Sequence, residues 1–465
     1  MSRFFLIPLI VACALFMENM DSTIITTSLP AIAQDLGENP LALNLALTAY
    51  LVSLAVFIPI SGWVADRYGS RSVFAAAIVV FVAGSLLCAA SSALAAFVAA
   101  RFLQGLGGAM MVPVGRLVLL RTVPKSELLA ALNYLTLPAL LGPVIGPPLG
   151  GFITLNFHWR WIFLINLPIG MLGLLLVLRY IPNIREPDVQ SLDVRGFLLS
   201  GIGLSVLVLG LSTLGRHLVS GEIAAACITA GVLALGGYAW HAQRAEHPLI
   251  NLNLLKLATF NTGVVGGSLF RIGVGATPFL LPLMLQLGFG LNPFQSGMLT
   301  CASAMGAMFM KTLTIRILKR YGFRAVLTAN AVLASCATAG YGLFAATTPH
   351  FVVVSVLLFS GCLRSLQFTS LNAISFADVS RQTMSQATSL SGMAQRLSQS
   401  MGVVIGALVL QMASSLHGHP GIEASDFWPA FLVIGVISAG SIFFHSRLPS
   451  NAGAEVSGHV SVTNS

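Results

Sequence analysis

The sequence predicts an all-α polytopic membrane protein with fourteen transmembrane helices, arranged as two six-helix domains with two further helices inserted between them. Three observations support this fold class. Hydrophobic residues occupy 56% of the 465 positions and charged residues only 8%, whereas soluble domains average about 25% charged residues. Apolar windows of roughly 20 residues, the length that crosses a bilayer, recur along the chain. The loops between these windows differ sharply in their content of Lys and Arg.

The first six apolar windows cover residues 5–32, 44–64, 72–92, 95–117, 128–154 and 161–181. The first window follows Arg3 and imitates a secretory signal peptide, but no small-x-small cleavage site follows it, so we expect an uncleaved first span. These windows define a predicted N-terminal domain, residues 1–183.

A polar stretch from Pro182 to Arg195 marks the first change of organisation. We interpret residues 184–257 as a linker with two inserted spans, at 196–215 and 222–241. The remaining six windows form the predicted C-terminal domain, residues 258–447. These windows cover residues 259–286, 294–315, 325–346, 351–375, 386–413 and 427–446. Residues 448–465 are expected to be a disordered cytoplasmic tail.

The basic residues predict the orientation of the chain. Sixteen of the 24 Lys and Arg residues lie in loops that face the cytoplasm if the N-terminus does, while Arg160 and Arg216 alone lie in the opposite loops. This bias places both termini in the cytoplasm. It also accounts for most of the net charge of +9, so we expect no nucleic acid partner.

Signatures of enzymes and metal sites are missing from the sequence. The six cysteines contain no Cys-x-x-Cys pair and lie in apolar stretches, which favours free thiols (Cys13, Cys88, Cys227, Cys301, Cys336 and Cys362). There is no G-x-x-x-x-G-K-[ST], His-Glu-x-x-His or G-x-S-x-G pattern. We therefore predict no enzyme activity, no cofactor and no metal, and a process driven by an ion gradient.

One internal repeat is visible in the loops. The segment Asp66–Val73 follows the second window, and Lys319–Val326 follows the second window of the last six, with five identities in eight positions. Duplicated halves of this kind are typical of transporters.

The first copy of the repeat predicts a cytoplasmic latch made by Gly62, Asp66, Arg67, Gly69 and Arg71. Gly62 permits a close approach, Gly69 permits a tight turn, and Asp66 can pair with a basic residue or a helix N-terminus. The alternative is a basic loop that only sets topology. The second copy has a lysine in place of the aspartate, so only the first half is expected to form the charged latch.

Two carboxyl groups and an arginine inside spans are the candidate proton-coupling residues: Asp21, Glu18 and Arg101. A carboxyl group in hydrocarbon favours its neutral, protonated form. Glu18 lies three residues before Asp21 on the same helical face, so the two would share a proton. Arg101 would cost at least ~2.5 kcal/mol in lipid and must find a partner. In the alternative readings, Asp21 is a neutralised or salt-bridged structural residue and Arg101 contacts a carbonyl.

The fifth window carries a stripe of glycines spaced four residues apart, which predicts a smooth helix face, with prolines that kink the helix. The motif residues are Gly142, Pro143, Gly146, Pro147, Gly150 and Gly151.

The last six windows contain cations and no acidic residue. We expect Lys311 and Arg364 to extend toward the cytoplasmic surface, and Arg271 and Arg396 to lie deeper without compensation. With Gln104 of the fourth window, Arg271, Arg364 and Arg396 are the candidate residues of a substrate cavity. Uncompensated cations favour an anionic or chelating substrate as an alternative cargo.

Four motifs together resemble the fourteen-span drug:proton antiporter family of the major facilitator superfamily. They are the latch loop, Arg101-x-x-Gln104-Gly105, the glycine and proline stripe, and Asp21-Ser-Thr-Ile-Ile-Thr-Thr-Ser-Leu-Pro30, where Ser28 replaces the usual alanine. The resemblance implies the superfamily fold and alternating access around a midplane cavity. It further implies proton coupling through Arg101 and Asp21 and export of small molecules across a bacterial inner membrane. The expected partners are the substrate, protons and lipid, with the protein as a monomer.

Other functions are possible for such a sequence. A non-transporting membrane sensor would need an output domain, and no loop is long enough to form one. A membrane enzyme would need a nucleophile or metal set. Uptake instead of export remains an alternative direction.

Overall fold

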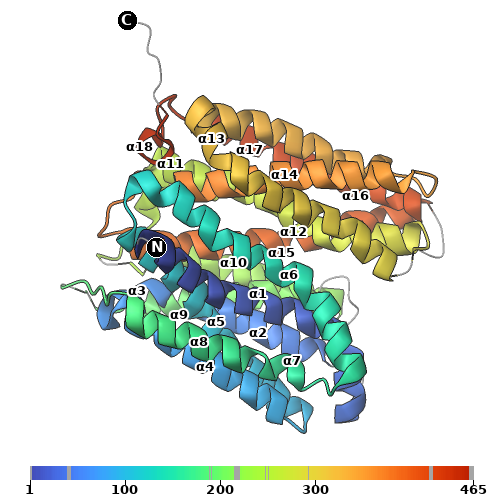
Figure 1. Ribbon diagram of the computed structural model, residues 1–465, viewed down its shortest axis with the longest axis horizontal. Helices are drawn as coiled ribbons and strands as arrows, with labels where there is room; N and C mark the ends of the chain where they lie inside the picture. The colour runs from blue at the N-terminus through green and yellow to red at the C-terminus, as the bar shows by residue number, and fades with distance from the viewer. Residues whose placement is uncertain are drawn as a thin grey trace, which may run out of the picture.

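The computed structural model describes residues 3–38, 43–187, 189, 191–213, 220–246, 248–249, 251–291, 293–417 and 423–459. Figure 1 shows long helices packed side by side, with the N-terminal half of the chain on one side and the C-terminal half on the other. We call helices α1–α8 the N lobe and helices α11–α17 the C lobe. The N lobe consists of α1 (Arg3–Leu36), α2 (Asn44–Phe57), α3 (Ser61–Tyr68), α4 (Ser70–Ala90), α5 (Leu94–Thr122), α6 (Leu128–Asn156), α7 (Trp161–Leu164) and α8 (Asn166–Tyr180).

The C lobe repeats the pattern of long apolar helices after an inserted hairpin. The insert consists of α9 (Val194–Thr213) and α10 (Gly221–Ala242). The C lobe consists of α11 (Ala258–Asn261), α12 (Gly267–Leu283), α13 (Pro293–Gly340), α14 (His350–Ser375), α15 (Met384–His417), α16 (Phe427–Ala439) and α17 (Ser441–Ser446). π-Helical turns at Thr262–Gly266 and Met284–Gly288 flank α12.

The all-α architecture and its membrane character are confirmed. Within the described residues, eleven helices are long and apolar enough to cross a membrane. One of these, Gln295–Leu343, covers two of the predicted windows. All fourteen predicted windows overlap helices, although the number of transmembrane spans stays a prediction.

The internal repeat is visible in the backbone. Gly69 separates α3 from α4 with φ 93°, and Gly322 interrupts α13 with φ 72°. Positive φ is accessible to glycine without steric cost. Both copies of the repeated segment therefore end a helix with the same unusual turn.

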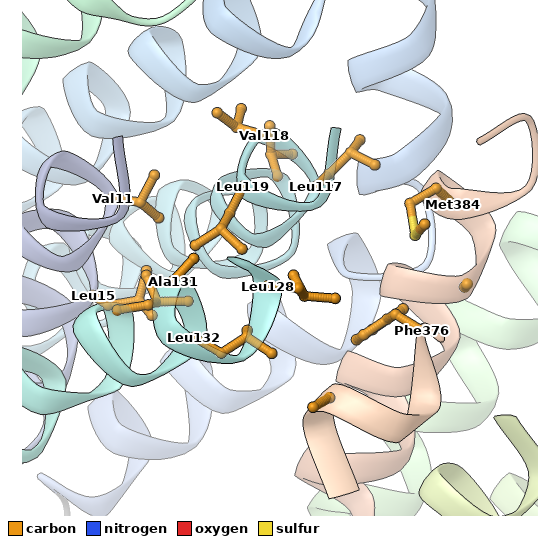
Figure 2. Packing of buried hydrophobic residues seen from close by; sticks show 14 of the residues in the cluster. Val11, Leu15, Leu117, Val118, Leu119, Leu128, Ala131, Leu132, Phe376 and Met384 are labelled. Atoms are coloured by element: carbon orange, nitrogen blue, oxygen red, sulfur yellow. The ribbon is translucent and has the colours of Figure 1, made fainter. Parts of the chain in front are cut away.

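An apolar core closes the interface between the lobes at the end of the bundle that carries the Gly69 turn, which we call the latch end. Figure 2 shows Leu117 of α5 and Leu128 of α6 opposite Met384 and Phe376 of the C lobe. All four side chains belong to one buried cluster that extends into both lobes. Burial of such side chains contributes about 1.5–3 kcal/mol each, so this end of the interface is firmly packed.

The C-terminal residues differ from the disordered tail that the sequence suggested. Residues 448–459 are ordered and include α18 (Ala454–Ser457), which contacts α13 of the C lobe and α6 of the N lobe. Val456 is buried, and the His459 ring lies 3.0 Å from the Lys319 carbonyl oxygen. Apolar Val456 and two left-handed glycines, Gly453 and Gly458, explain why this short segment folds back on the bundle.

Candidate functional site

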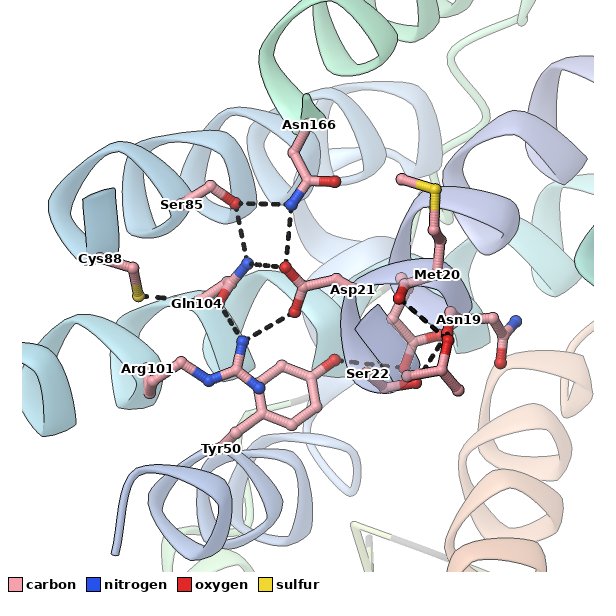
Figure 3. A network of polar contacts seen from close by, with 12 residues as sticks. Asn19, Met20, Asp21, Ser22, Tyr50, Ser85, Cys88, Arg101, Gln104 and Asn166 are labelled. Atoms are coloured by element: carbon pink, nitrogen blue, oxygen red, sulfur yellow. Dashed lines mark hydrogen bonds and ion pairs between the residues drawn. The ribbon is translucent and has the colours of Figure 1, made fainter. Parts of the chain in front are cut away.

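A buried carboxylate, Asp21 of α1, lies at the centre of a polar network inside the N lobe (Figure 3). Its Oδ2 atom accepts a hydrogen bond from Arg101 Nη1 at 2.7 Å within an ion pair. Its Oδ1 atom accepts hydrogen bonds from Gln104 Nε2 at 2.9 Å and Asn166 Nδ2 at 2.8 Å. The side chain is 0% exposed. Three donors, one of them cationic, stabilise the charged carboxylate in this position.

The donors around Asp21 are themselves held by neighbours. Ser85 of α4 accepts hydrogen bonds from Gln104 Nε2 at 2.8 Å and Asn166 Nδ2 at 3.1 Å. Arg101 Nη1 also donates to Gln104 Oε1 at 2.5 Å, and its guanidinium lies 4.5 Å from the centre of the Tyr50 ring. Arg101 therefore has a carboxylate partner, as expected for a cation inside the bilayer. The network joins α1, α2, α4, α5 and α8 into one unit.

The second carboxyl group of α1, Glu18, contacts the opposite lobe. Its Oε1 atom accepts a hydrogen bond from Arg396 Nη2 of α15 at 2.6 Å and another from the Tyr50 hydroxyl at 3.4 Å. Its Oε2 atom is buried and has no partner among the described residues. The side chain of Glu18 is 3% exposed and that of Arg396 is 39% exposed.

Two expectations about these groups are wrong. Glu18 and Asp21 do not share a proton site, because each carboxylate pairs with its own arginine, one in each lobe. Arg396 is not an uncompensated cation, because Glu18 provides the acidic partner that the C lobe itself lacks. Sequence separation conceals this pair, since the two residues lie 378 positions apart.

The glycine stripe of α6 packs directly on α1 beside these carboxyl groups. A Cβ atom on Gly142 would lie 2.9 Å from the Met20 backbone nitrogen, and one on Gly146 would overlap Thr23 Oγ1. Gly150 is also buried. The stripe therefore has the smooth packing face that its spacing predicts. Pro143, Pro147 and Gly151 belong to the same helix, but their surroundings lie outside the described residues.

Asp66 joins the latch loop to both lobes. Its Oδ1 atom accepts a hydrogen bond from Arg121 Nη2 of α5 at 2.7 Å. Its Oδ2 atom accepts a hydrogen bond from the Ser385 hydroxyl in the first turn of α15. Arg121 also pairs with Glu186 of the linker at 2.9 Å. Asp66 thus contacts both a basic residue and the N-terminal turn of a C-lobe helix.

The other predicted latch residues divide into two groups. Gly62 donates its backbone N–H to Ser389 Oγ at 3.1 Å, and an added Cβ would lie 2.7 Å from the Ser385 carbonyl oxygen. Gly69 makes the turn before α4. Arg67 is exposed, and neither Arg67 nor Arg71 forms an ion pair in the part of the chain that the structure describes. The close approach and the charge contact of the loop therefore come from Gly62 and Asp66.

A cavity of about 450 Å³ lies beside this loop, between α3, the linker and α15. Its walls include four carboxyl side chains and several hydroxyl and amide groups (Asp66, Glu186, Asp193, Glu246, Ser385 and Gln386). Asp193 precedes α9 and accepts hydrogen bonds from the Gly196 and Leu249 backbone N–H groups, and it pairs with His241 at 2.9 Å. Burial alone would raise the pKa of Asp193, but these donors outweigh that effect and lower the pKa below its usual range.

The four candidate residues of a substrate cavity are not brought together. Gln104 belongs to the Asp21 network, and Arg396 pairs with Glu18. Arg271 is fully buried and donates hydrogen bonds to the Gly263 carbonyl oxygen at 3.0 Å and to Asn372 Oδ1 at 3.3 Å. Arg364 donates to Ser303 Oγ at 2.8 Å inside the C lobe.

Lys311 does not extend to the membrane surface as the sequence suggested. Lys311 is buried, with 6% of its surface exposed, and its ammonium group donates a hydrogen bond to the Thr369 hydroxyl of α14. Its backbone carbonyl oxygen accepts a hydrogen bond from Asn133 Nδ2 of α6 at 3.1 Å. The expectation was wrong because α13 packs Lys311 between α14 and the N lobe instead of leaving it at a helix end.

Several residues of these networks were missed by the sequence analysis. Asn166, Ser85 and Tyr50 complete the carboxylate sites, and Ser385 and Ser389 receive the latch loop. Asn166 had a usable signal, because an amide side chain in an apolar helix requires a buried partner. The serines had none, since hydroxyl groups in helices commonly bond to the preceding turn.

The sequence comparisons agree with this architecture. The sequence pattern of the family described as "Major Facilitator Superfamily" matches residues 11–403. A protein of Pectobacterium carotovorum named "Putative multidrug resistance protein MdtD" is 40% identical over 449 residues, which cover 95% of both chains. A protein of the same name from Escherichia coli is 38% identical over 448 residues, covering 95% of this chain and 94% of its own.

Solved structures show the same fold at lower sequence identity. The proton:xylose symporter XylE superposes with a TM-score of 0.68 at 14% identity, covering 97% of both chains. The human organic anion transporter MFSD10 superposes with a TM-score of 0.64 at 14% identity, covering 95% of this chain and 97% of its own. The chain therefore belongs to the Major Facilitator Superfamily and is a multi-pass membrane transporter of small molecules, not an enzyme.

Proposed function

We propose that this protein exports small molecules of the multidrug type from the cytoplasm across the bacterial inner membrane, in exchange for protons. The names of its bacterial relatives support the multidrug range. One structural observation carries the proposal. Two buried carboxyl groups one turn apart on α1 each bind an arginine, Arg101 in the same lobe and Arg396 in the opposite lobe. Intramembrane carboxyl groups of this kind mark proton and substrate pathways.

The arrangement couples a proton to movement of the lobes. Removing one partner of a buried ion pair costs about 3–5 kcal/mol, so protonation of a carboxyl group changes which lobe contacts are favourable. Each pH unit across the membrane supplies about 1.4 kcal/mol per proton. A gradient of two to three units therefore matches the energy of a fully buried pair such as Asp21–Arg101. The Glu18–Arg396 pair needs less, because solvent screens Arg396, whose side chain is 39% exposed. Asp21, Glu18 and Arg101 are the proposed coupling residues, and rocking of the two lobes exposes them alternately.

The proposed orientation places both termini and the latch end in the cytoplasm. The distribution of Lys and Arg supports it, since the loops on that side contain sixteen of these residues and the opposite loops two. The protein acts as a monomer in this proposal, because a single chain provides both lobes and therefore both sides of the transport path.

Gradient-driven transport in proteoliposomes tests the proposal. Ethidium is the probe, in vesicles with purified protein oriented with the latch end outside and with an acidic interior. We expect ethidium to accumulate and the accumulation to collapse with nigericin. Asp21→Asn abolishes it, whereas Asp35→Asn, a carboxylate change at the other end of α1, leaves it in place. The proposal is overturned if ethidium still accumulates after nigericin has collapsed the pH gradient, or if Asp21→Asn transports ethidium as well as the unmodified protein.

Export of an organic anion or a metal chelate is the second candidate. Arg271, Lys311 and Arg364 form no ion pair with a carboxylate within the described residues, and the described spans of the C lobe up to α15 contain no acidic side chain. Such a lobe would attract an anion once it opens to water. Accumulation of carboxyfluorescein in preference to ethidium in the same vesicles, lost in Arg271→Ala, would favour this candidate. A preference for ethidium would exclude it.

A further inference from the structure

The two carboxyl groups of α1 differ in how completely they are hydrogen-bonded. Asp21 uses both oxygen atoms, with Arg101, Gln104 and Asn166 as donors. Glu18 uses one oxygen atom, and the buried Oε2 atom has no partner in the described structure. A buried carboxylate oxygen without a donor is costly while the group is charged. That cost falls when a proton occupies the oxygen, because an unpaired neutral hydroxyl group is less costly to bury than an unpaired charged oxygen.

The two groups also differ in what they hold together. Every donor to Asp21 belongs to the N lobe, so these contacts are unchanged when the lobes move as rigid bodies. Glu18 on α1 and Arg396 on α15 belong to different lobes. Their ion pair therefore exists only while the lobes are as close as they are in this structure.

The electrostatic surroundings of Glu18 come from several helices. Arg396 of α15 and the Tyr50 hydroxyl of α2 contact it, and Asp21 lies on the same helix. Arg101 of α5 lies over the Tyr50 ring. Arg116 of α5 is buried and repels Arg396. The titratable side chains Tyr134 of α6 and Arg179 and Tyr180 of α8 are exposed. Arg396 is thus the one cation in direct contact with Glu18 among the described residues.

Other contacts between the two lobes, at the latch end, also form only while the N lobe and the C lobe are close together. Asp66 contacts Ser385, Gly62 contacts Ser389, and Asn133 contacts the Lys311 carbonyl oxygen. Apart from Asp66, these contacts involve neutral groups. The Glu18–Arg396 pair is therefore the titratable inter-lobe contact that lies deepest in the bundle, midway along α1.

We propose that Glu18 is the carboxyl group that exchanges its proton during the transport cycle, and that its protonation releases Arg396 and lets the lobes part at the latch end. Asp21 keeps its hydrogen bonds to Arg101, Gln104 and Asn166 throughout, as a fixed part of the N lobe. This assignment rests on the proposed function and adds a division of labour to it. Loss of the ion pair removes an attraction between lobes, while the N lobe itself keeps its internal network.

The direction of the effect fits proton antiport. In the present conformation the latch end is closed and the Glu18–Arg396 pair is formed. A proton that arrives from the opposite side neutralises Glu18, frees Arg396 and permits opening at the latch end. Release of that proton to the cytoplasm restores the charge on Glu18, so the pair re-forms as the latch end closes again.

The distance between the lobes as a function of pH tests the assignment without any substrate. Spin labels are placed at the equivalent exposed positions 67 and 320, through Arg67→Cys and Arg320→Cys, with the six native cysteines replaced by alanine. Double electron–electron resonance is then recorded in lipid nanodiscs between pH 5 and pH 8.5. In protein that keeps Glu18, Asp21 and Arg396, the two spin labels should be close together at high pH. At low pH an increasing fraction of molecules should show a longer distance between the labels.

Substitutions at the two carboxyl sites decide between them. Glu18→Gln, a neutral residue of the same shape, should give the long-distance population at every pH, and Arg396→Gln should do the same. Asp21→Asn blocks transport by disturbing the N-lobe network, but it leaves the Glu18–Arg396 pair in place and should therefore retain the pH-dependent change in distance. The control Asp35→Asn should retain both the change in distance and transport. A normal pH response in Glu18→Gln overturns the assignment, as does loss of the response in Asp21→Asn protein that elutes as a folded monomer.

The outcomes separate this inference from the proposed function. If Asp21→Asn does not fold, Glu18→Gln and Arg396→Gln still decide the result, since both leave the Asp21 network intact. Gradient-driven ethidium transport together with a normal pH response in Glu18→Gln would refute the assignment alone. Ethidium transport that does not depend on the pH gradient would refute the proposed function, whatever the distances between the spin labels show.

Discussion

Gly146 of α6 lies so close to Thr23 of α1 that a Cβ atom at position 146 would overlap the threonine Oγ1 atom. Thr23 follows Asp21 by two residues on the helix that carries both buried carboxyl groups. The glycine motif and the acidic motif, which are separate signals in the sequence, are therefore two sides of one helix contact.

Gly146→Val should destabilise the protein and reduce transport. Valine must displace Thr23 or push α6 away from α1, and overpacking of this kind costs about 1–3 kcal/mol. Thermal unfolding in detergent and ethidium transport measure the effect. Gly236→Val in α10 is the matched control, because a Cβ there meets nothing within 4 Å and the change in helix propensity is the same. Equal melting temperatures for the two variants would contradict the close contact.

Asp66→Asn should loosen the latch end without unfolding the bundle. The Arg121 hydrogen bond loses its charged acceptor, and the Ser385 hydrogen bond becomes a weaker neutral one. We expect hydrogen exchange of the first turns of α15 to become several-fold faster. Arg67→Gln in the same loop should leave this exchange unchanged, because Arg67 is exposed and forms no ion pair among the described residues. Unchanged exchange in Asp66→Asn would show that the loop does not hold the lobes together.

Asn166→Ala should lower stability, because Asp21 and Ser85 each lose a hydrogen-bond donor inside the N lobe. A buried partner left unsatisfied costs about 1–3 kcal/mol. Asn156→Ala provides a control, since Asn156 is exposed and its side chain, within the described part of the chain, donates only to the Phe152 carbonyl oxygen of its own helix. The difference in melting temperature between the two variants measures the contribution of the Asp21 network, and no difference would refute it.

Asp193→Ala should destabilise the insert at neutral pH and lose its effect in acid. Asp193 caps α9 through Gly196 and ties it to Leu249 and His241. Its pKa is lowered in the folded protein, so its stabilisation is present above the unfolded value of about 3.9 and is lost as the pH falls through the folded pKa. The loss of a cap costs about 0.5–2 kcal/mol.

Thermal unfolding between pH 3 and pH 8 checks this dependence. The difference in melting temperature between the unmodified protein and Asp193→Ala should be constant above pH 5 and shrink below pH 4. Glu246→Ala, at an exposed acidic position outside the helices, should show no such pattern. A difference that grows on acidification would contradict the assigned role of Asp193.

The sequence predicts the fold well because membrane helices are specified locally. Each window is apolar enough to be recognised alone, and the turns at Gly69 and Gly322 are marked by the repeat. The ordered segment around Val456 was not predicted, because one buried valine in a polar tail gives no periodic signal. Its binding surface exists only after both lobes have assembled.

The candidate site was predictable only in part. A buried charge needs a partner, so the sequence could predict that Asp21 and Arg101 are compensated. It could not pair Glu18 with Arg396, because lobe packing brings these residues together from opposite ends of the chain. Lys311 was misplaced for the same reason, since its depth depends on α14 and α6 and not on its own helix.

The insert has unequal attachments to the two lobes, and this inequality has a kinetic consequence. Helix α9 lies along α2 of the N lobe, whereas its buried apolar contact with α15 is a small cluster of Leu207, Leu211 and Val404, with Leu397 packed against it. Because α9 contacts α2 more extensively than α15, we expect the hairpin to move with the N lobe when the lobes rock, and Val404 to shift relative to Leu207 and Leu211. This small apolar contact resists the relative movement of the two helices. We therefore expect Val404→Ala to change the rate of turnover and to leave both end conformations of the transporter in place.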